Sequence, residues 1–371
     1  MLLLKKIFLI SFILVMHLSC KKSDAQANTV PVVKIKPPVA VNYINIINSE
    51  SNFILGHQTS DGAFTMSADG ATQGYKIVPY FSNIAARALL ENPTPAVITA
   101  VKKWMTWYMA HLNTDGSVYD YYASNYTGNV TYTSTNDFDS IDSYAATFMT
   151  LAKRLCDVSP SDKIWLTKNY SAQLILIGKA LSLVTEPNGL TIAKPSYQVE
   201  YTMDNSEVNE GLADMVWLSQ KVITGGDPAY WQTLLTNNTH AIETDLWNTS
   251  NGRYFMYKDG PVANWSTFYA DATCQLYPIW CGVIQPDSQR AQSLWLTFNA
   301  NYPKWQAGQI YDAGGYPWTV LSYTGAVMND KTRVDSYLRY VQSFTDQGKQ
   351  PTANWYNLEA AFVILAAKKM N

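Results

Sequence analysis

The sequence predicts an all-α domain, an (α/α)6 toroid built from six helical hairpins. Two observations lead to this prediction. Helical periodicity dominates the chain, and one short loop motif returns at the start of every second helix. The motif joins Asp, Asn, Tyr or Trp to small residues at the helix start, and its copies lie at 79–86, 139–146, 204–211, 268–272, 316–318 and 354–357. Recurrence of one unit at a coarse period is typical of repeat architectures.

Twelve helices are expected from the spacing of the apolar residues. The segment 140–156 shows the pattern most clearly, because Ile141, Tyr144 and Phe148 fall on one helical stripe. The expected helices cover residues 41–53, 79–91, 95–112, 140–156, 164–185, 206–224, 228–246, 268–284, 287–300, 317–328, 332–346 and 354–369. Helices joined by short connections pack antiparallel to their neighbours, so twelve helices give six hairpins.

The helices that begin with the loop motif are rich in Ala and Gly, so we expect them to form the inner ring. The intervening helices carry bulkier and charged residues and are expected outside. The helix near 41–53 is expected to pair with the last one and close the circle, which brings all the loop motifs to one face. Between helices, Asn251-Gly252 predicts a β-hairpin, and 190–201 is typical of an edge strand or an extended loop.

The amino terminus carries an export signal. Lys5 and Lys6 precede a short apolar run that stops before Cys20, which resembles a bacterial lipoprotein signal over residues 1–19 with a lipid on Cys20. A plain secretory signal is the alternative. Residues 20–40 are then a lipid-anchored tether, and 41–371 one toroid domain. Because lysines follow Cys20, we expect attachment to the outer membrane facing the periplasm, with the cell surface as the alternative.

Composition excludes several classes of function. The net charge of −2 and the lack of a basic cluster argue against nucleic-acid binding. Cys274 and Cys281 are seven residues apart on an expected helix, about 10 Å, which is too far for a disulfide, so buried free thiols are expected there and at Cys156. The sequence has no zinc-ligand spacing and no phosphate loop. We therefore expect no metal and no cofactor. A monomer is also expected.

Five passages carry a resemblance to a known family. They are Gly62-Ala63 and the segments 79–83, 139–144, 201–205 and 268–276. In these the chain resembles the six-hairpin glycosidase superfamily, whose members fold as (α/α)6 toroids, over roughly residues 41 to 370. The resemblance implies a carbohydrate substrate and glycoside hydrolase activity. Segment 201–205 is also similar to the Asp-containing stretch of the unsaturated glucuronyl hydrolase type, which implies a catalytic role for Asp204.

Most glycosidases use two carboxyl groups, one as general acid and the other as base or nucleophile. Two acidic clusters stand out, at 137–142 and 204–207, and a further aspartate follows the first expected helix. The expected catalytic residues are Asp204, Asp142, Asp139, Asp61 and Glu207. Helix capping is the alternative for most of them, a capping box for Asp204 with Glu207, and a turn for Asp61.

Aromatic and amide side chains are concentrated at the starts of the expected inner helices, where core packing alone does not predict them. We interpret them as sugar-binding residues. The expected set is Tyr80, Asn83, Tyr144, Tyr201, Asn205, Tyr269, Asp271, Asp312, Trp318, Trp355 and Tyr356. Two other functions compete with hydrolysis: a polysaccharide lyase that uses His57 or a Tyr, and a glycan-binding lipoprotein without activity.

Overall fold

The computed structural model describes residues 40–67 and 75–371, and residues from Ala40 to Asn371 form one compact unit. The predicted signal at 1–19, the lipid site at Cys20 and the tether up to residue 39 lie outside the described residues. Across the part of the chain that is described, no helix combines the length and the apolar character needed to cross a membrane.

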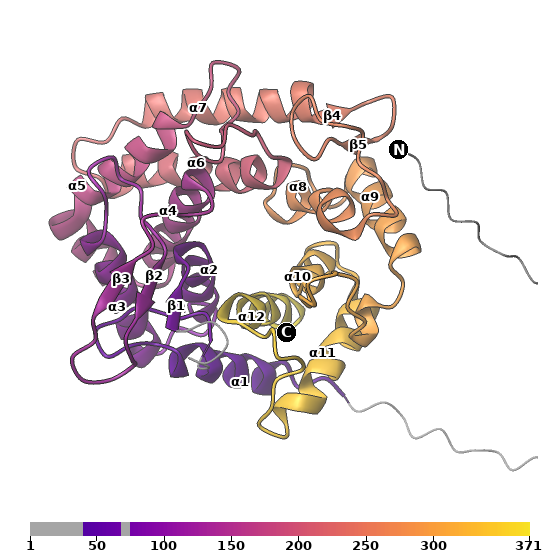
Figure 1. The fold of residues 1–371 in the computed structure, drawn as a ribbon, viewed down its shortest axis with the longest axis horizontal. Coiled ribbons are helices and arrows are strands. Elements are labelled where there is room, and N and C mark those ends of the chain that lie inside the picture. Colours follow the sequence, from indigo (N-terminus) through magenta and orange to yellow (C-terminus); the bar gives the residue numbers. More distant parts are fainter. Residues whose placement is uncertain (1–39, 68–74) are drawn as a thin grey trace, which may run out of the picture. The chain divides into compact units, whose positions relative to one another are not determined.

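The described residues form twelve α-helices in two concentric rings (Figure 1). The outer ring consists of α1 (Tyr43–Gly56), α3 (Pro95–Ala110), α5 (Pro160–Leu183), α7 (Pro228–Ala241), α9 (Gln289–Asn301) and α11 (Lys331–Thr345). The inner ring consists of α2 (Pro79–Leu89), α4 (Ile141–Val158), α6 (Thr202–Lys221), α8 (Tyr277–Trp280), α10 (Val320–Val327) and α12 (Asn357–Met370). The predicted all-α toroid, with motif-bearing helices inside, is confirmed.

The inner ring is closed. Each inner helix packs against the next, and α12 packs against both α10 and α2, so the sixth helix contacts the first. The first outer helix, α1, lies along α12, as the sequence predicted. Trp355 Nε1 donates to Glu50 Oε2 at 3.0 Å, and the Asn357 amide donates to the Met66 carbonyl at 3.0 Å. These bonds join segments about three hundred residues apart.

Small residues allow the inner helices to approach closely. Gly211 on α6 faces Ala146 on α4, and a Cβ added at Gly211 would lie 2.6 Å from the Ala146 Cα. Real Cβ contacts are not that short, so only glycine fits there without displacing α4. The three described cysteines are buried free thiols, as expected.

The predicted helix at 268–284 is wrong in detail. The structure has a short π-helical turn, Phe268–Ala272, and then α8, Tyr277–Trp280. Tyr269 has extended backbone angles (φ −108°, ψ 130°), which no helix accommodates. Pro278 lies at the start of α8, where its missing amide costs no helical hydrogen bond. The segment that precedes the fifth outer helix, α9, is therefore mostly loop, and it brings Tyr269 to the ring's centre.

Five short strands lie in the described connections between helices. Strands β1 (Tyr75–Ile77), β2 (Tyr121–Ala123) and β3 (Tyr132–Ser134) form an antiparallel sheet that the sequence did not predict. Each has only three residues, too few to show alternation. Strands β4 (Trp247–Asn248) and β5 (Arg253–Tyr254) form the hairpin predicted at Asn251-Gly252. Residues 190–201 form an extended loop with isolated bridges.

We predict that Gly211→Ala destabilises the domain by about 1–3 kcal/mol, because its methyl group overpacks the contact between α4 and α6. Gly56→Ala is the matched control. It is also helical, nothing lies within 4 Å of an added Cβ, and alanine favours the helix by up to about 1 kcal/mol. Urea unfolding of both variants measures the difference, and equal midpoints would show that the two inner helices are not in tight contact.

We predict a pH-dependent stabilisation by Glu50→Gln. Burial raises the pKa of Glu50 to about 7 from 4.5, so the folded state holds this proton more tightly than the unfolded state. That stabilisation is present below about pH 4.5 and is lost as pH rises through about 7. Glutamine removes the titration but still accepts from Trp355. The free energy of unfolding of the variant, relative to that of the wild type, should therefore rise by on the order of 1–3 kcal/mol between pH 5 and pH 8.

Urea unfolding at both pH values measures this gain. Glu186→Gln, at a partly exposed glutamate in the loop after α5, is the control and should show no such gain. A pH-independent difference between Glu50→Gln and the wild type would show that Glu50 does not titrate in the folded protein.

Candidate active site

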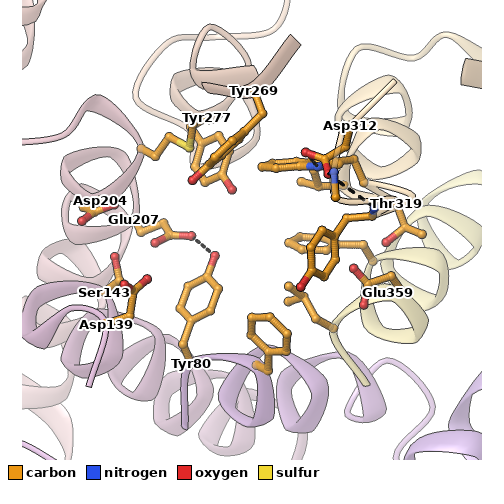
Figure 2. A pocket seen from close by; sticks show the side chains of 18 of the residues that line it. Tyr80, Asp139, Ser143, Asp204, Glu207, Tyr269, Tyr277, Asp312, Thr319 and Glu359 are labelled. Atoms are coloured by element: carbon orange, nitrogen blue, oxygen red, sulfur yellow. Dashed lines mark hydrogen bonds between the residues drawn. The ribbon is translucent and has the colours of Figure 1, made fainter. Parts of the chain in front are cut away.

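A cavity of about 780 Å³ lies within the inner ring, at the end where the inner helices begin. Figure 2 shows its walls. The first turns of α2, α4, α6 and α12 supply one set of side chains, and the segments 267–277 and 311–319 supply the other. Because all inner helices run in the same direction, the repeated loop motifs converge on this one space.

One wall of the cavity is acidic. Asp139, just before α4, and Asp204 and Glu207 on α6 all line it, and Asp142 lies buried behind them. Burial raises the pKa of Asp204 strongly, and the negative charges of Asp142, Glu207 and Asp139 raise it further. Like charges this close cannot all ionise, so the wall retains protons near neutral pH.

Glu207 has a specific partner in this wall. Tyr80 on α2 donates its hydroxyl proton to Glu207 Oε1 at 2.5 Å (Figure 2). Burial raises the pKa of Glu207 to about 8, and the Tyr80 hydrogen bond works against that rise by stabilising the carboxylate. One turn further along α6, Glu210 forms a 2.7 Å ion pair with Arg87 of α2. A protonated Glu207 near neutral pH can donate a proton into the cavity.

Two carboxyl groups face this wall from the other side of the cavity. Glu359 lies in the first turn of α12, where Oε2 accepts the Tyr356 amide at 3.2 Å, and burial raises its pKa to about 7. Asp312 accepts from the Gly314 amide at 2.7 Å and from Trp318 Nε1 at 3.2 Å. Figure 2 shows Glu207 and Glu359 on opposite sides of the space.

Aromatic rings make up much of the remaining lining. Tyr269 lies 5.0 Å from Trp318, centroid to centroid, and the residue is 57% exposed. Tyr80 stacks on Tyr144 at 6.4 Å, and Tyr277 lines the cavity beside them. Apolar faces combined with a few convergent polar groups are typical of small-molecule sites.

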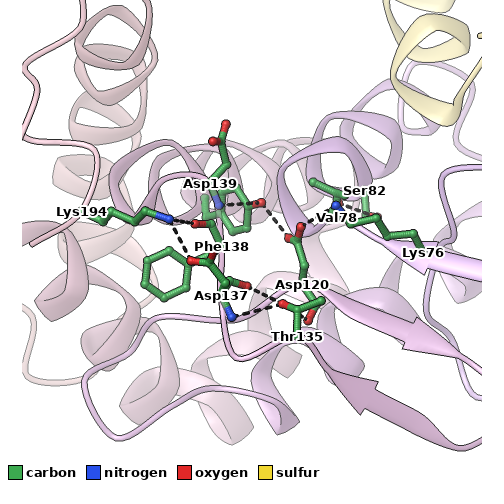
Figure 3. Close-up of polar contacts among 10 residues, drawn as sticks. Lys76, Val78, Ser82, Asp120, Thr135, Asp137, Phe138, Asp139 and Lys194 are labelled. Carbon is green, nitrogen blue, oxygen red and sulfur yellow. Dashed lines mark hydrogen bonds and ion pairs between the residues drawn. The ribbon is translucent and has the colours of Figure 1, made fainter. Parts of the chain in front are cut away.

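A polar network outside the cavity fixes the segment that carries Asp139 (Figure 3). Lys194 donates to Asp137 Oδ1 at 2.8 Å and to the Phe138 carbonyl at 2.5 Å. On the other side, the Tyr144 hydroxyl donates to buried Asp120 at 2.8 Å and accepts from the Asp139 amide at 3.5 Å. The backbone is held from both sides, and the Asp139 side chain is left for the cavity.

The structure brings together about half of the residues singled out in the sequence. Those that line the cavity are Asp139, Asp204, Glu207, Tyr80, Tyr144, Tyr269, Asp312 and Trp318. Those that lie outside it are Asp61, Asp142, Asn83, Tyr201, Asn205, Asp271, Trp355 and Tyr356. Tyr201 is at the mouth, as the N-cap residue of α6.

Two of the expected catalytic aspartates point elsewhere. Asp61 accepts from the hydroxyl groups of Tyr132 and Thr59 in the loop beside the small sheet. Asp142 is fully buried, and its Oδ2 accepts from Thr191 at 2.7 Å. Asp142 thus joins the 190–201 loop to α4, and Asp61 joins its own loop to strand β3.

The expected binding residues outside the cavity mostly hold helix starts in place. Asn83 bonds Tyr144 and Trp104 across three helices, and Asn205 accepts from the Thr191 amide at 2.8 Å. Asp271 accepts from an amide in its own loop. The Trp355 indole reaches Glu50, and Tyr356 caps α12.

Sequence reasoning missed Glu359. It follows the loop motif at 354–357, where only the aromatic residues attracted notice. Glu359 is the third residue after its N-cap Tyr356, just as Asp204 is the third after its N-cap Tyr201. Comparing equivalent positions of the repeats would have found it.

Two alternatives considered for the sequence, a capping box at Asp204 and His57 as a lyase base, do not fit the geometry. Helix α6 begins at Thr202, so Asp204 is in its first turn and forms no capping box with Glu207. His57 is buried against Phe53 at the end of α1, and burial lowers its pKa to about 4. It does not line the cavity, so a lyase at this cavity has no histidine base from it. Within the described ranges, no three His, Cys, Asp or Glu side chains are grouped to hold a metal ion.

Comparison with solved structures finds toroids of the same kind. A wild-type glycosidase superposes with a TM-score of 0.61 at 11% identity, covering 88% of this chain and 96% of that one. The GH63 mannosylglycerate hydrolase from Thermus thermophilus, in complex with glucose, gives a TM-score of 0.60 at 11% identity, over 86% and 99%. The chain has the six-hairpin glycosidase fold.

A glycosidase variant solved in complex with glucose also superposes, with a TM-score of 0.61 at 11% identity over 88% and 96% of the chains. At such identity the likeness establishes the six-hairpin fold alone. No protein-family model matches the sequence, and no curated protein does.

Proposed function

We propose that this six-hairpin protein is a glycoside hydrolase in which Glu207 is the general acid and Glu359 the general base. One observation carries the proposal: two buried carboxyl groups face each other across a single aromatic-lined cavity. Burial favours the protonated form of Glu207, as a general acid requires, and the lower pKa of Glu359 lets it ionise first.

The chemical step follows from this arrangement. Glu207 transfers its proton to the glycosidic oxygen as the bond from that oxygen to the anomeric carbon breaks. Glu359 takes a proton from water as the water oxygen bonds to the anomeric carbon. Attack from the side opposite the acid inverts the anomeric configuration. Exchange with solvent then restores both carboxyl groups.

The cavity suits the sugar ring whose anomeric carbon carries the bond that is cleaved. Tyr269 and Trp318 offer apolar faces, and Asp139, Asp204 and Asp312 offer acceptors for hydroxyl groups. Two fold neighbours were solved with bound glucose, and one of them is a mannosylglycerate hydrolase. Glucosides and mannosides are therefore the first substrates to test.

We predict that Glu207→Gln and Glu359→Gln each lower kcat by about 10²- to 10⁴-fold on whichever glucoside or mannoside the wild type hydrolyses. Glutamine keeps the acceptor that Tyr80 or the Tyr356 amide uses, so the fold should survive while proton transfer is lost. Release of reducing sugar measures the rate, and proton NMR of the first product should show an inverted anomer.

The control for this experiment is Asp61→Asn, at a carboxylate outside the cavity, which should stay active. Asp139→Asn and Asp204→Asn are expected to act mainly on KM. The assignment fails if Glu207→Gln retains a tenth of the activity while Asp204→Asn or Asp139→Asn abolishes it. Product absorbing in the ultraviolet, from a new double bond, would indicate a lyase instead.

We predict a bell-shaped pH profile of kcat/KM with limbs near 7 and 8, since Glu359 must be ionised and Glu207 protonated. Tyr80→Phe removes a donor that stabilises the Glu207 carboxylate, so its pKa rises and the alkaline limb moves to higher pH. The acidic limb should not move. If only the acidic limb shifts, Glu207 is the general base and Glu359 the general acid.

A further inference from the structure

A second group of aromatic side chains lies just beyond the cavity mouth. Tyr197, in the loop before α6, is 49% exposed. Its hydroxyl is 2.7 Å from that of Tyr201, and the two ring centroids are 6.2 Å apart. The edge of Tyr257 contacts Tyr201 at 5.9 Å from the other side. The three rings form one partly exposed aromatic cluster.

This pair of rings is continuous with the cavity. Tyr201 is the N-cap residue of α6, and Met203 and Asp204, in the first turn of that helix, line the cavity. Tyr201 and Tyr197 therefore lie next to the cavity lining, at the end of α6 where the cavity is.

The pair lies on the side where a leaving group would exit. Asp204 and Glu207 are one turn apart on α6 and both line the cavity, and Tyr201 precedes them at the N-terminal end of that helix. Tyr201 is about 9 Å nearer the mouth than Glu207 along the helix axis. The general acid protonates the oxygen between the cleaved sugar and its leaving group, so that group extends from Glu207 towards Tyr201.

The loop that carries Tyr197 is fixed before any ligand binds. Lys194 and Tyr197 close a tight turn, with the Tyr197 amide donating to the Lys194 carbonyl at 2.8 Å. The Lys194 ammonium then anchors this turn to Asp137 and Phe138 (Figure 3). One lysine thus holds both the Tyr197 turn and the segment that carries Asp139. Preorganised rings lose little entropy on binding.

We propose that Tyr197 and Tyr201 form a binding site for the leaving-group saccharide, so that the substrate is an oligosaccharide rather than a glycoside of a small alcohol. The inference rests on the proposed hydrolase function. Tyr197 stacks on a sugar ring beyond the scissile bond, and Tyr201 orients the Tyr197 ring through their shared hydroxyl contact.

The test compares leaving groups. The probes are glucosyl and mannosyl fluorides, whose leaving group is a single atom, and gluco- and manno-oligosaccharides of two to five units. With Tyr197→Ala, kcat/KM for the oligosaccharides should fall about 3- to 10-fold, mainly through KM. The fluoride rate should be unchanged. Tyr197→Phe keeps the ring but loses the hydroxyl contact with Tyr201, so it should restore part of the loss.

The matched control is Tyr230→Ala on α7, which removes an aromatic ring of similar exposure, 43%, from the outer ring of helices. It should affect neither probe. Equal effects of Tyr197→Ala on fluoride and oligosaccharide, or no effect on either, overturn the leaving-group site while hydrolysis stands. If the wild type turns over none of these probes, the hydrolase proposal itself fails, and the site falls with it.

Discussion

The whole arrangement depends on closure of the inner ring. Helix α12 must pack against α2, although their sequences are separated by nearly the whole domain. The Trp355–Glu50 and Asn357–Met66 hydrogen bonds fix this contact, and small residues such as Gly211 allow the other inner helices to come close enough for the circle to close. Because the helices run parallel within the inner ring, closure forces their amino-terminal ends into one shared space.

That shared space explains the electrostatics. Carboxylates at helix starts are ordinarily stabilised by the helix dipole and by water. Here closure removes much of the water, so burial becomes the largest influence on Glu207, Glu359 and Asp204 and raises all three pKa values. The hydrogen-bond partners of Glu207 and Glu359 then distinguish the proposed roles of these two residues. Glu207 accepts a hydrogen bond from the Tyr80 hydroxyl, whereas Glu359 accepts one from a backbone amide.

In the proposed function, the loops that connect the inner and outer helices contribute substrate specificity. They are not held by helix packing, so polar contacts hold them. Lys194 joins the loop before α6 to the segment before α4, and Asp120 with Tyr144 secures that segment from the other side. The aromatic side chains that face the proposed leaving group, Tyr197 and Tyr201, belong to these loops.

The sequence by itself determined the helix periodicity, the repeated motif and therefore the twelve-helix toroid, because these depend on local spacing of apolar and small residues. It also pointed to Asp139, Asp204 and Glu207, because acidic helix starts are visible in one dimension. Tertiary structure alone decided that Asp142 and Asp61 turn away from the cavity, that Glu359 faces Glu207, and that the helix expected at 268–284 breaks. These outcomes depend on which side chain meets which neighbour across the ring, and no local pattern records that.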